Sequence, residues 1–153
     1  MERTPDENRR EQKIARGIAP FGYKEIMIPE LKEGDNITFI YDAERSGFNK
    51  KSRHYPLYDL NPNIVLIKAL RNRKTGKIII YGLNANYLDS KLERGRLILY
   101  SRTQTGINKR LFEKAIHCYS LSRVKSKIFK SDKTVADLSL MRSAADWVRA
   151  NTI

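Results

Sequence analysis

Alternating apolar and polar side chains predict strands in the first half of the chain. The stretch DNITFIYDAE, residues 35–44, places Thr38 and Asp42 on one face and three large apolar side chains on the other, which is typical of a half-buried strand. The apolar side chains are those of Ile37, Phe39 and Tyr41. Residues 63–72, NIVLIKALRN, are almost all apolar, so we expect a central strand covered on both faces.

A hairpin and an unusual strand end follow. In the turn RKTG, Gly76 supplies the positive φ that such a hairpin favours, and residues 77–88 predict a third strand antiparallel to the second. That strand loses its apolar pattern at Gly82, Asn84 and Asn86, which share one face. We interpret these amides as a structural joint that pins a neighbouring loop, because buried amides usually satisfy backbone groups. The alternative is a pocket that faces a ligand.

The second half of the chain predicts helices around one further strand. We expect a helix capped by Asp89 or Ser90, a second helix over residues 109–119 with its cap at 105–108, a basic strand over 120–130, and a last helix within 131–151. The last helix has a buried stripe made of Val135, Leu138, Met141, Ala145 and Val148. This order predicts an α+β fold, either a small twisted antiparallel sheet or an SH3-like barrel, with helices packed on it.

The N-terminal residues differ in composition from the rest of the chain. Residues 1–16 are charged with little apolar content, and the next stretch is punctuated by Pro20, Gly22 and Pro29, as in an extended connector. We therefore predict an N-terminal arm over residues 1–30 and a single α+β domain over residues 31–153. The arm carries four side chains that we expect to anchor it in a neighbouring subunit, namely Phe21, Tyr23, Ile26 and Ile28.

Composition agrees with a folded, strongly basic protein. The chain has 153 residues, 41% of them hydrophobic, and a net charge of +13 from 30 basic and 17 acidic residues. Residues 45–133 hold 21 basic and 5 acidic residues, a net charge of +16. Such a field attracts nucleic acid, anionic surfaces or acidic proteins, although it also serves solubility alone. We find no membrane-spanning apolar run and no apolar signal region, so we expect synthesis in a cytoplasm and no membrane partner.

Catalytic and metal-binding patterns are sparse. The chain lacks a P-loop, a G-x-S-x-G elbow and an H-E-x-x-H motif. The single cysteine, Cys118, neighbours His117, but adjacent residues point apart, so we expect Cys118 to be a small buried apolar residue. Three carboxylates that could in principle gather a metal show no telling spacing; they are Asp42, Asp59 and Asp89. We predict no enzyme, no cofactor and no metal site.

The basic residues fall into an ordered set. Four surround the hairpin turn, two lie further on, and three alternate along the predicted basic strand. In order they are Arg71, Arg73, Lys74 and Lys77; Arg94 and Arg96; and Arg123, Lys125 and Lys127. We expect the hairpin tip and the basic strand to be adjacent in the sheet, where they would follow a phosphate backbone. The alternative is that a solvated hairpin tip is simply charged.

Three stretches resemble a group of small basic proteins of contractile-tailed bacteriophages (myoviruses). They are YPLYDLNPNIVLI, IYGLNANYLDSKLERGRL and YSLSRVKSKIF, and they cover about residues 55–130. The matching residues are Tyr58, Asp59 and Pro62; Gly82, Asn84, Tyr87 and Leu88; and Tyr119, Leu121, Ser122, Val124 and Ser126. The chain has Asn86 where the pattern usually has histidine, so no histidine-dependent role carries over.

The resemblance implies a non-enzymatic structural or assembly component of a virion, present in several copies, that contacts other virion proteins and, through its basic surface, DNA or an acidic neighbour. A DNA-end-binding protein is the alternative, and a metal-dependent nuclease is third.

Overall fold

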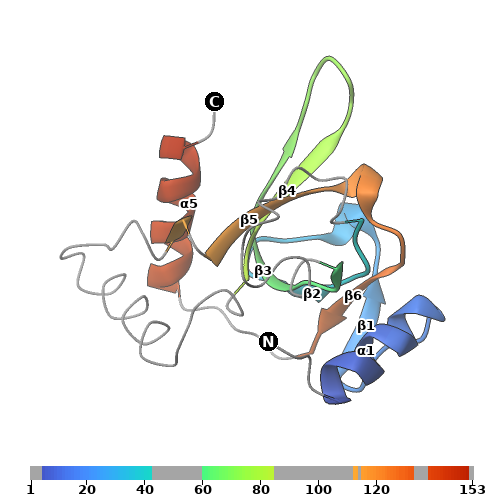
Figure 1. The fold of residues 1–153 in the computed structure, drawn as a ribbon. Helices are drawn as coiled ribbons and strands as arrows, with labels where there is room; N and C mark the ends of the chain where they lie inside the picture. The colour runs from blue at the N-terminus through green and yellow to red at the C-terminus, as the bar shows by residue number, and fades with distance from the viewer. Residues whose placement is uncertain (1–4, 43–59, 85–111, 114, 133–137, 152–153) are drawn as a thin grey trace.

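The computed structural model describes residues 5–42, 60–84, 112–113, 115–132 and 138–151 (Figure 1). These residues form six strands, two α-helices and two 3-10 helices. In chain order they are α1 (Pro5–Ala15), β1 (Tyr23–Ile26), η1 (Ile28–Glu30), β2 (Asn36–Thr38), β3 (Asn63–Arg71), β4 (Ile78–Leu83), β5 (Ile116–Ser120), η4 (Leu121–Arg123), β6 (Ile128–Ser131) and α5 (Leu138–Asn151). The fold is α+β, as the sequence predicts.

All six strands belong to one antiparallel sheet in the order β1-β6-β2-β3-β4-β5. The prediction that residues 63–72 form a central strand antiparallel to the next one is confirmed, because β3 lies between β2 and β4. β1 and β5 lie at the two ends, so the sheet is open, and the SH3-like barrel is not confirmed. After β2 the chain still pairs once more, through a bridge between Tyr41 and Val124.

Both faces of the sheet are covered by apolar side chains. Alternate residues of β3 and β4 enter two separate core clusters, with Leu66 and Ile80 in one and Ile67 and Leu83 in the other. The first cluster contains an aromatic trio with edge-to-face ring contacts, made by Phe39, Tyr41 and Tyr119. The second is covered by α5 through Ala144 and Val148. Each fully buried large side chain contributes about 1.5–3 kcal/mol, so both clusters hold the sheet in place.

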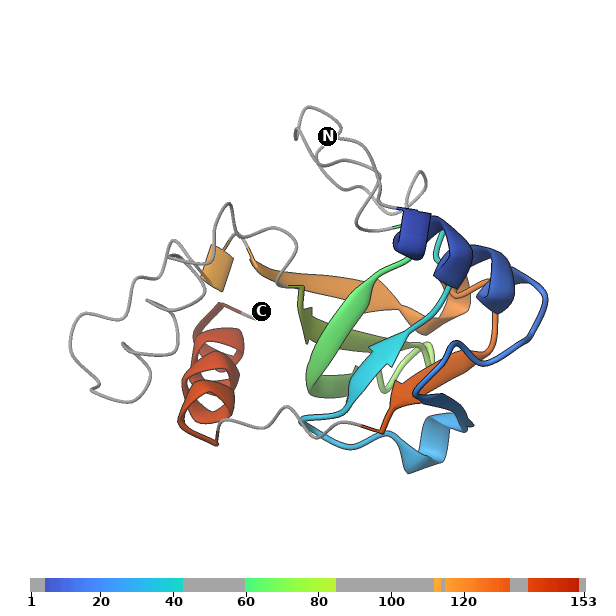
Figure 2. The same cartoon turned by 90° about the horizontal axis from the view of Figure 1, so that it is seen from below.

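The two helices lie on different sides of the sheet. Figures 1 and 2 show α1 and α5 well apart, with α5 on the side of β5 and α1 on the side of β1 and β6. α5 confirms the predicted last helix, and Met141, Ala145 and Val148 of the predicted stripe face the second cluster. Val135 of that stripe is outside the described residues, as are Asp89 and Ser90 and the cap and first residues of the predicted second helix, 105–111.

Two predicted elements and the predicted orientation of one side chain are wrong. Residues 116–119, expected to continue a helix, form β5 instead, and they pair with β4. The predicted basic strand over 120–130 is interrupted by η4, and regular pairing resumes only at Ile128. Thr38, expected on the polar face, is fully buried between Asn61 and Pro62. Its hydroxyl donates to the Pro62 carbonyl at 2.8 Å and accepts from Asn61 Nδ2 at 3.1 Å, which satisfies it inside the core.

The predicted N-terminal arm is also not a separate unit. β1 is hydrogen-bonded to β6, and Ile26 pairs with Ile128 in the first core cluster. α1 forms within the stretch expected to be extended or featureless, and Ile14 at its end is buried. Arg10 of α1 donates from Nε to the Asn61 side chain at 3.0 Å. Residues 5–30 therefore pack on the sheet, because apolar residues spaced through a charged stretch still find a common core.

Candidate nucleic-acid interface

The β3–β4 hairpin projects away from the body of the molecule (Figure 1). Its register shifts between Leu66 and Lys68, while Ile80, which pairs with Ala69 beyond the shift, is still buried in the first core cluster. Beyond that point four cross-strand pairs continue to Arg71 and Ile78. A β-bulge bends a strand and increases its twist, so this irregularity sets the direction in which the hairpin points.

The turn at the hairpin tip is held by its own hydrogen bonds. The Asn72 side-chain oxygen accepts from the backbone N–H groups of Lys74 at 2.9 Å and Thr75 at 3.1 Å. The Asn72 backbone closes the turn, donating to the Lys77 carbonyl and accepting from Gly76 N–H, both at 2.8 Å. Gly76 adopts φ 71°, which confirms the positive φ predicted from the sequence. The tip therefore has a defined shape although it is exposed.

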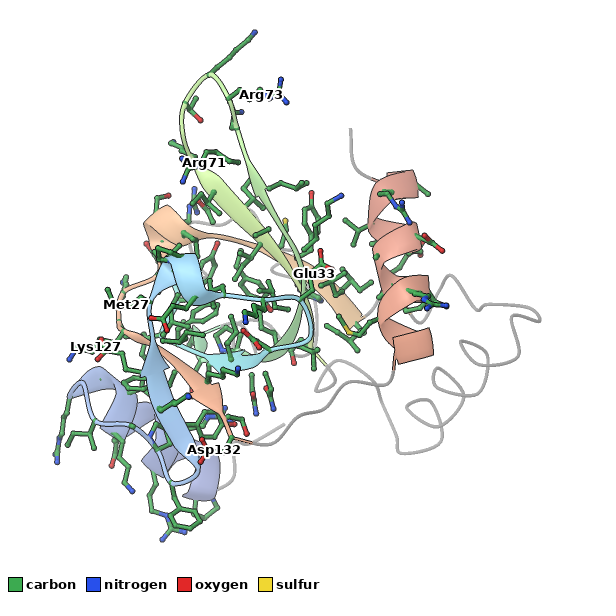
Figure 3. The ribbon with its side chains drawn as sticks, turned by 180° about the vertical axis from the view of Figure 1, so that it is seen from behind. Met27, Glu33, Arg71, Arg73, Lys127 and Asp132 are labelled. Atoms are coloured by element: carbon green, nitrogen blue, oxygen red, sulfur yellow. The ribbon has the colours of Figure 1, made fainter. Side chains whose placement is uncertain are left out.

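This tip displays four cations and no acid. Arg71, Arg73, Lys74 and Lys77 are all exposed, and Figure 3 shows Arg71 and Arg73 on the projecting hairpin. None of the four makes an ion pair within the part of the chain that the structure describes. Like charges held this close raise the local positive potential, and a polyanion relieves the repulsion. We call residues 71–77 the basic tip.

The other predicted basic residues do not join the basic tip. β6 is separated from β4 by β2 and β3, but η4, which follows β5 and ends at Arg123, contacts β4, so the expected adjacency holds at Arg123 and is lost toward Lys127. Figure 3 shows Lys127 at a distance from Arg71 and Arg73, and its Nζ lies 3.7 Å from Glu25 Oε2. The alternation expected for Arg123, Lys125 and Lys127 also fails, since η4 and a bend replace the strand there. Arg94 and Arg96 lie outside the described residues.

Arg123 has a different environment from the basic tip. It is partly buried at the end of η4, and its Nη1 atom is buried without a hydrogen-bond partner among the described residues. Its backbone carbonyl accepts from Asp42 N–H at 3.0 Å, which ties η4 to the chain after β2. Lys125, in contrast, is exposed, and its backbone N–H donates to the Ile40 carbonyl at 2.8 Å. These contacts give the segment a structural role that its charge pattern did not indicate.

The four expected anchor residues divide into two pairs. Ile26 is only 7% exposed and belongs to the core, and Tyr23 is half-buried in β1 with its hydroxyl 3.5 Å from Asn63 Oδ1. The burial of Ile26 contradicts its expected role as an anchor, and the role of half-buried Tyr23 stays a prediction. Phe21 and Ile28 are exposed by 98% and 47% and stay available for a contact with another molecule.

Asn84 directly follows β4 in the sequence and lies beside the start of β5 in space. It is fully buried, its N–H donates to the Ala115 carbonyl at 2.7 Å, and its Nδ2 donates to the Tyr119 hydroxyl at 3.4 Å. These contacts agree with the interpretation of a joint, because both partners belong to the segment that pairs with β4. Asn86 lies outside the described residues.

Other groups of chemically reactive side chains are sparse. Within the described ranges, no three His, Cys, Asp or Glu side chains are grouped so that they could hold a metal ion. Cys118 is exposed on β5, so the expectation that it is buried is wrong. His117 and Cys118 pair with Gly82 and Tyr81 respectively and so lie on opposite faces of β5. No helix among the described residues is long and apolar enough to span a membrane.

One surface feature was missed by sequence reasoning. A groove of about 360 Å³ lies between η1 and the segment that joins η4 to β6, and we call it the η1–η4 groove. It is lined by Glu25, Ile26, Met27, Ile28, Pro29, Leu121, Val124, Ser126, Lys127 and Ile128. Two apolar residues beside a proline, Met27 and Ile28, were the available signal, but the opposite wall comes from nearly a hundred residues further along the chain.

No protein-family model, curated protein or solved structure matches this chain.

Proposed function

We propose that this protein is a non-enzymatic structural or assembly component of a tailed-phage particle and that its basic tip contacts the phosphates of double-stranded DNA. The observation that carries the proposal is a set of four exposed cations on one projecting, hydrogen-bonded hairpin, none of which forms an ion pair with the described part of the chain. The resemblance of residues 55–130 to small basic myovirus proteins supports the setting in a particle.

The shape and composition of the hairpin favour duplex DNA over single strands. A two-stranded ribbon is narrow enough to enter the major groove, and its flanking lysines and arginines then reach the phosphates. Residues 71–77 contain no aromatic side chain on which unpaired bases could stack. An acidic surface of a neighbouring virion protein is the competing partner for the same charges.

Salt-titrated duplex binding tests the proposal. The hairpin variant carries Arg71→Ala, Arg73→Ala, Lys74→Ala and Lys77→Ala. The control variant removes the same number of arginines and lysines, two of each, at exposed positions away from the hairpin. It carries Lys13→Ala, Arg16→Ala, Lys24→Ala and Arg142→Ala. We expect the slope of log affinity against log salt to fall by about 0.9 for each phosphate that the hairpin variant no longer neutralises, and to stay nearly unchanged in the control. Unrelated duplex sequences should lose affinity equally, because phosphates carry no base identity.

Three outcomes separate the alternatives. Equal losses of duplex affinity in the hairpin variant and the control would mean that total charge, and not the basic tip, drives binding. Absence of wild-type binding even at low salt would reject DNA as the partner and leave the acidic protein neighbour. A preference for linear over closed circular duplex would favour the DNA-end-binding alternative. The assembly part of the proposal requires that the chain co-purify with particles at a fixed copy number.

A further inference from the structure

Exposed apolar side chains are concentrated in one stretch of the sequence, and two of them line the η1–η4 groove. Of the five large hydrophobic residues exposed in the described part of the chain, four lie between residues 18 and 28, and the fifth is Ile79 on the hairpin. Met27 and Ile28, which line the groove, are 59% and 47% exposed. Large side chains left in water forgo the free energy of burial, so a cluster of them beside a groove marks a contact surface.

The groove is held open by rigid elements. Its floor includes Ile26 and Ile128, which are paired partners in β1 and β6. One wall is η1, where Met27 N–H donates to the Glu30 carboxylate at 3.3 Å. The opposite wall is η4 and its continuation, where Val124 N–H donates to the Leu121 carbonyl at 3.2 Å. A partner therefore meets a preformed surface and loses little free energy in ordering it.

The surroundings of the groove are basic. Lys127 lies on its rim, and a Cβ atom added at Gly17 would lie 3.9 Å from Cε of Lys127, so the turn after α1 reaches the same edge. Arg16 and Lys125 are exposed and adjoin Gly17 and the groove-lining Val124 and Ser126 in the sequence, whereas Lys24 lines a separate pocket with Asp35 and Asp132. The acidic residues of the region are Glu25, which pairs with Lys127 at 3.7 Å, and Glu30, which caps η1. The cations outnumber the acids, so an incoming acidic group is attracted.

We infer that the η1–η4 groove binds a segment of a partner protein in which a bulky apolar side chain is flanked by aspartate or glutamate. The apolar side chain fills the groove between Ile28 and Val124, and the carboxylates lie near Lys127 and the exposed cations around it. This surface is separate from the basic tip, as Figure 3 shows for Met27 and Lys127 against Arg71 and Arg73, and the inference does not depend on DNA binding. With both surfaces occupied, the protein links DNA to a protein neighbour.

Other occupants fit the groove less well. A second copy of the chain brings the same net charge of +13 and so repels the first. Nucleic-acid bases prefer aromatic platforms, and the residues that line the groove are aliphatic, methionine or polar. Lipid surfaces favour exposed apolar side chains beside lysines, and vesicles therefore enter the experiment as a comparison.

Selection from a displayed library of random peptides tests the inference. The full-length protein is the bait, and enriched peptides are remade in fluorescent form for affinity measurements. The groove variant is Ile28→Glu, and its matched control is Ile79→Glu, which makes the same change at a similarly exposed isoleucine on the hairpin. We expect peptides with an apolar anchor and acidic flanks, which bind the groove variant at least about tenfold more weakly and the control unchanged. Replacing the peptide's acids with lysine should abolish binding.

Several results overturn the inference. They are enrichment of no peptide or of basic peptides, equal binding by Ile28→Glu and Ile79→Glu, and self-association of the wild type that Ile28→Glu abolishes. Stronger binding to phosphatidylserine vesicles than to any selected peptide, absent in Ile28→Glu, would assign the surface to lipid instead. A cooperative unfolding transition of Ile28→Glu close to that of the wild type shows that the variant is folded, and duplex binding at the wild-type level shows that the two surfaces act separately. If Ile28→Glu fails to fold, Met27→Glu takes its place, since Met27 is more exposed.

Discussion

A Cβ atom at Gly82 would lie 2.3 Å from Cδ1 and 2.8 Å from Cβ of Ile64, so β4 passes over the Ile64 side chain with no room to spare. Gly82 is buried and pairs with Leu66 on one side and His117 on the other. β4 is thus held between its paired strands β3 and β5 and cannot move away from Ile64.

We expect Gly82→Ala to lower the free energy of unfolding by about 1–3 kcal/mol, because the added methyl group displaces a packed core side chain. Urea denaturation measures this change. Combining it with Ile64→Ala should recover part of the loss, since the second substitution removes the obstacle. If the changes in the free energy of unfolding simply add, a side chain at position 82 does not clash with Ile64.

Asn84→Leu should also destabilise the isolated protein, by about 1–3 kcal/mol, because the polar groups around the buried amide lose a partner. Thermal and urea unfolding in the absence of any ligand provide the measurement. Tyr119→Phe, which removes the hydroxyl that accepts from Asn84, should show a smaller loss. Unchanged stability together with abolished binding of DNA or peptide would place Asn84 in a site and contradict the joint.

Two isoleucines of the predicted arm should behave oppositely. Ile26→Ala should lower the free energy of unfolding by about 2–5 kcal/mol, because Ile26 is buried against Ile128. Ile28→Ala should change it by less than about 0.5 kcal/mol, because Ile28 is largely exposed. Similar small changes at both positions would restore the view of residues 1–30 as an arm that the core does not need.

The Asn72 side chain should affect DNA binding through shape and not through charge. Asn72→Ala removes the acceptor for two backbone N–H groups, so we expect duplex affinity to fall by about threefold to tenfold as the tip loses its preset form. The salt slope should not change, because all four cations stay. Asn72→Asp keeps the acceptor and adds a negative charge, so its loss of duplex affinity should be largest at low salt. A smaller salt slope in Asn72→Ala would contradict this division.

The sequence alone determined the local features of the protein. The apolar run at 63–71, the RKTG turn with its positive φ at Gly76, and the amphipathic last helix all appeared as predicted, because periodicity and turn chemistry act over a few neighbouring residues. The four cations of the basic tip were also evident, since they flank that turn. The charge of the basic tip and the local secondary structure could therefore be predicted directly from the sequence.

Only the tertiary structure decided how distant segments meet. Ile26 looked like a free anchor until its pairing with Ile128 placed it in the core, and residues 116–119 looked helical until their pairing with β4 made them a strand. η4 contacts β4, but the chain beyond it leads away to β6, so Lys127 lies at a distance from the hairpin. The η1–η4 groove is formed by walls nearly a hundred residues apart in the sequence. Burial and strand pairing depend on contacts between remote segments, and these outweigh the weak local preferences that a sequence pattern reports.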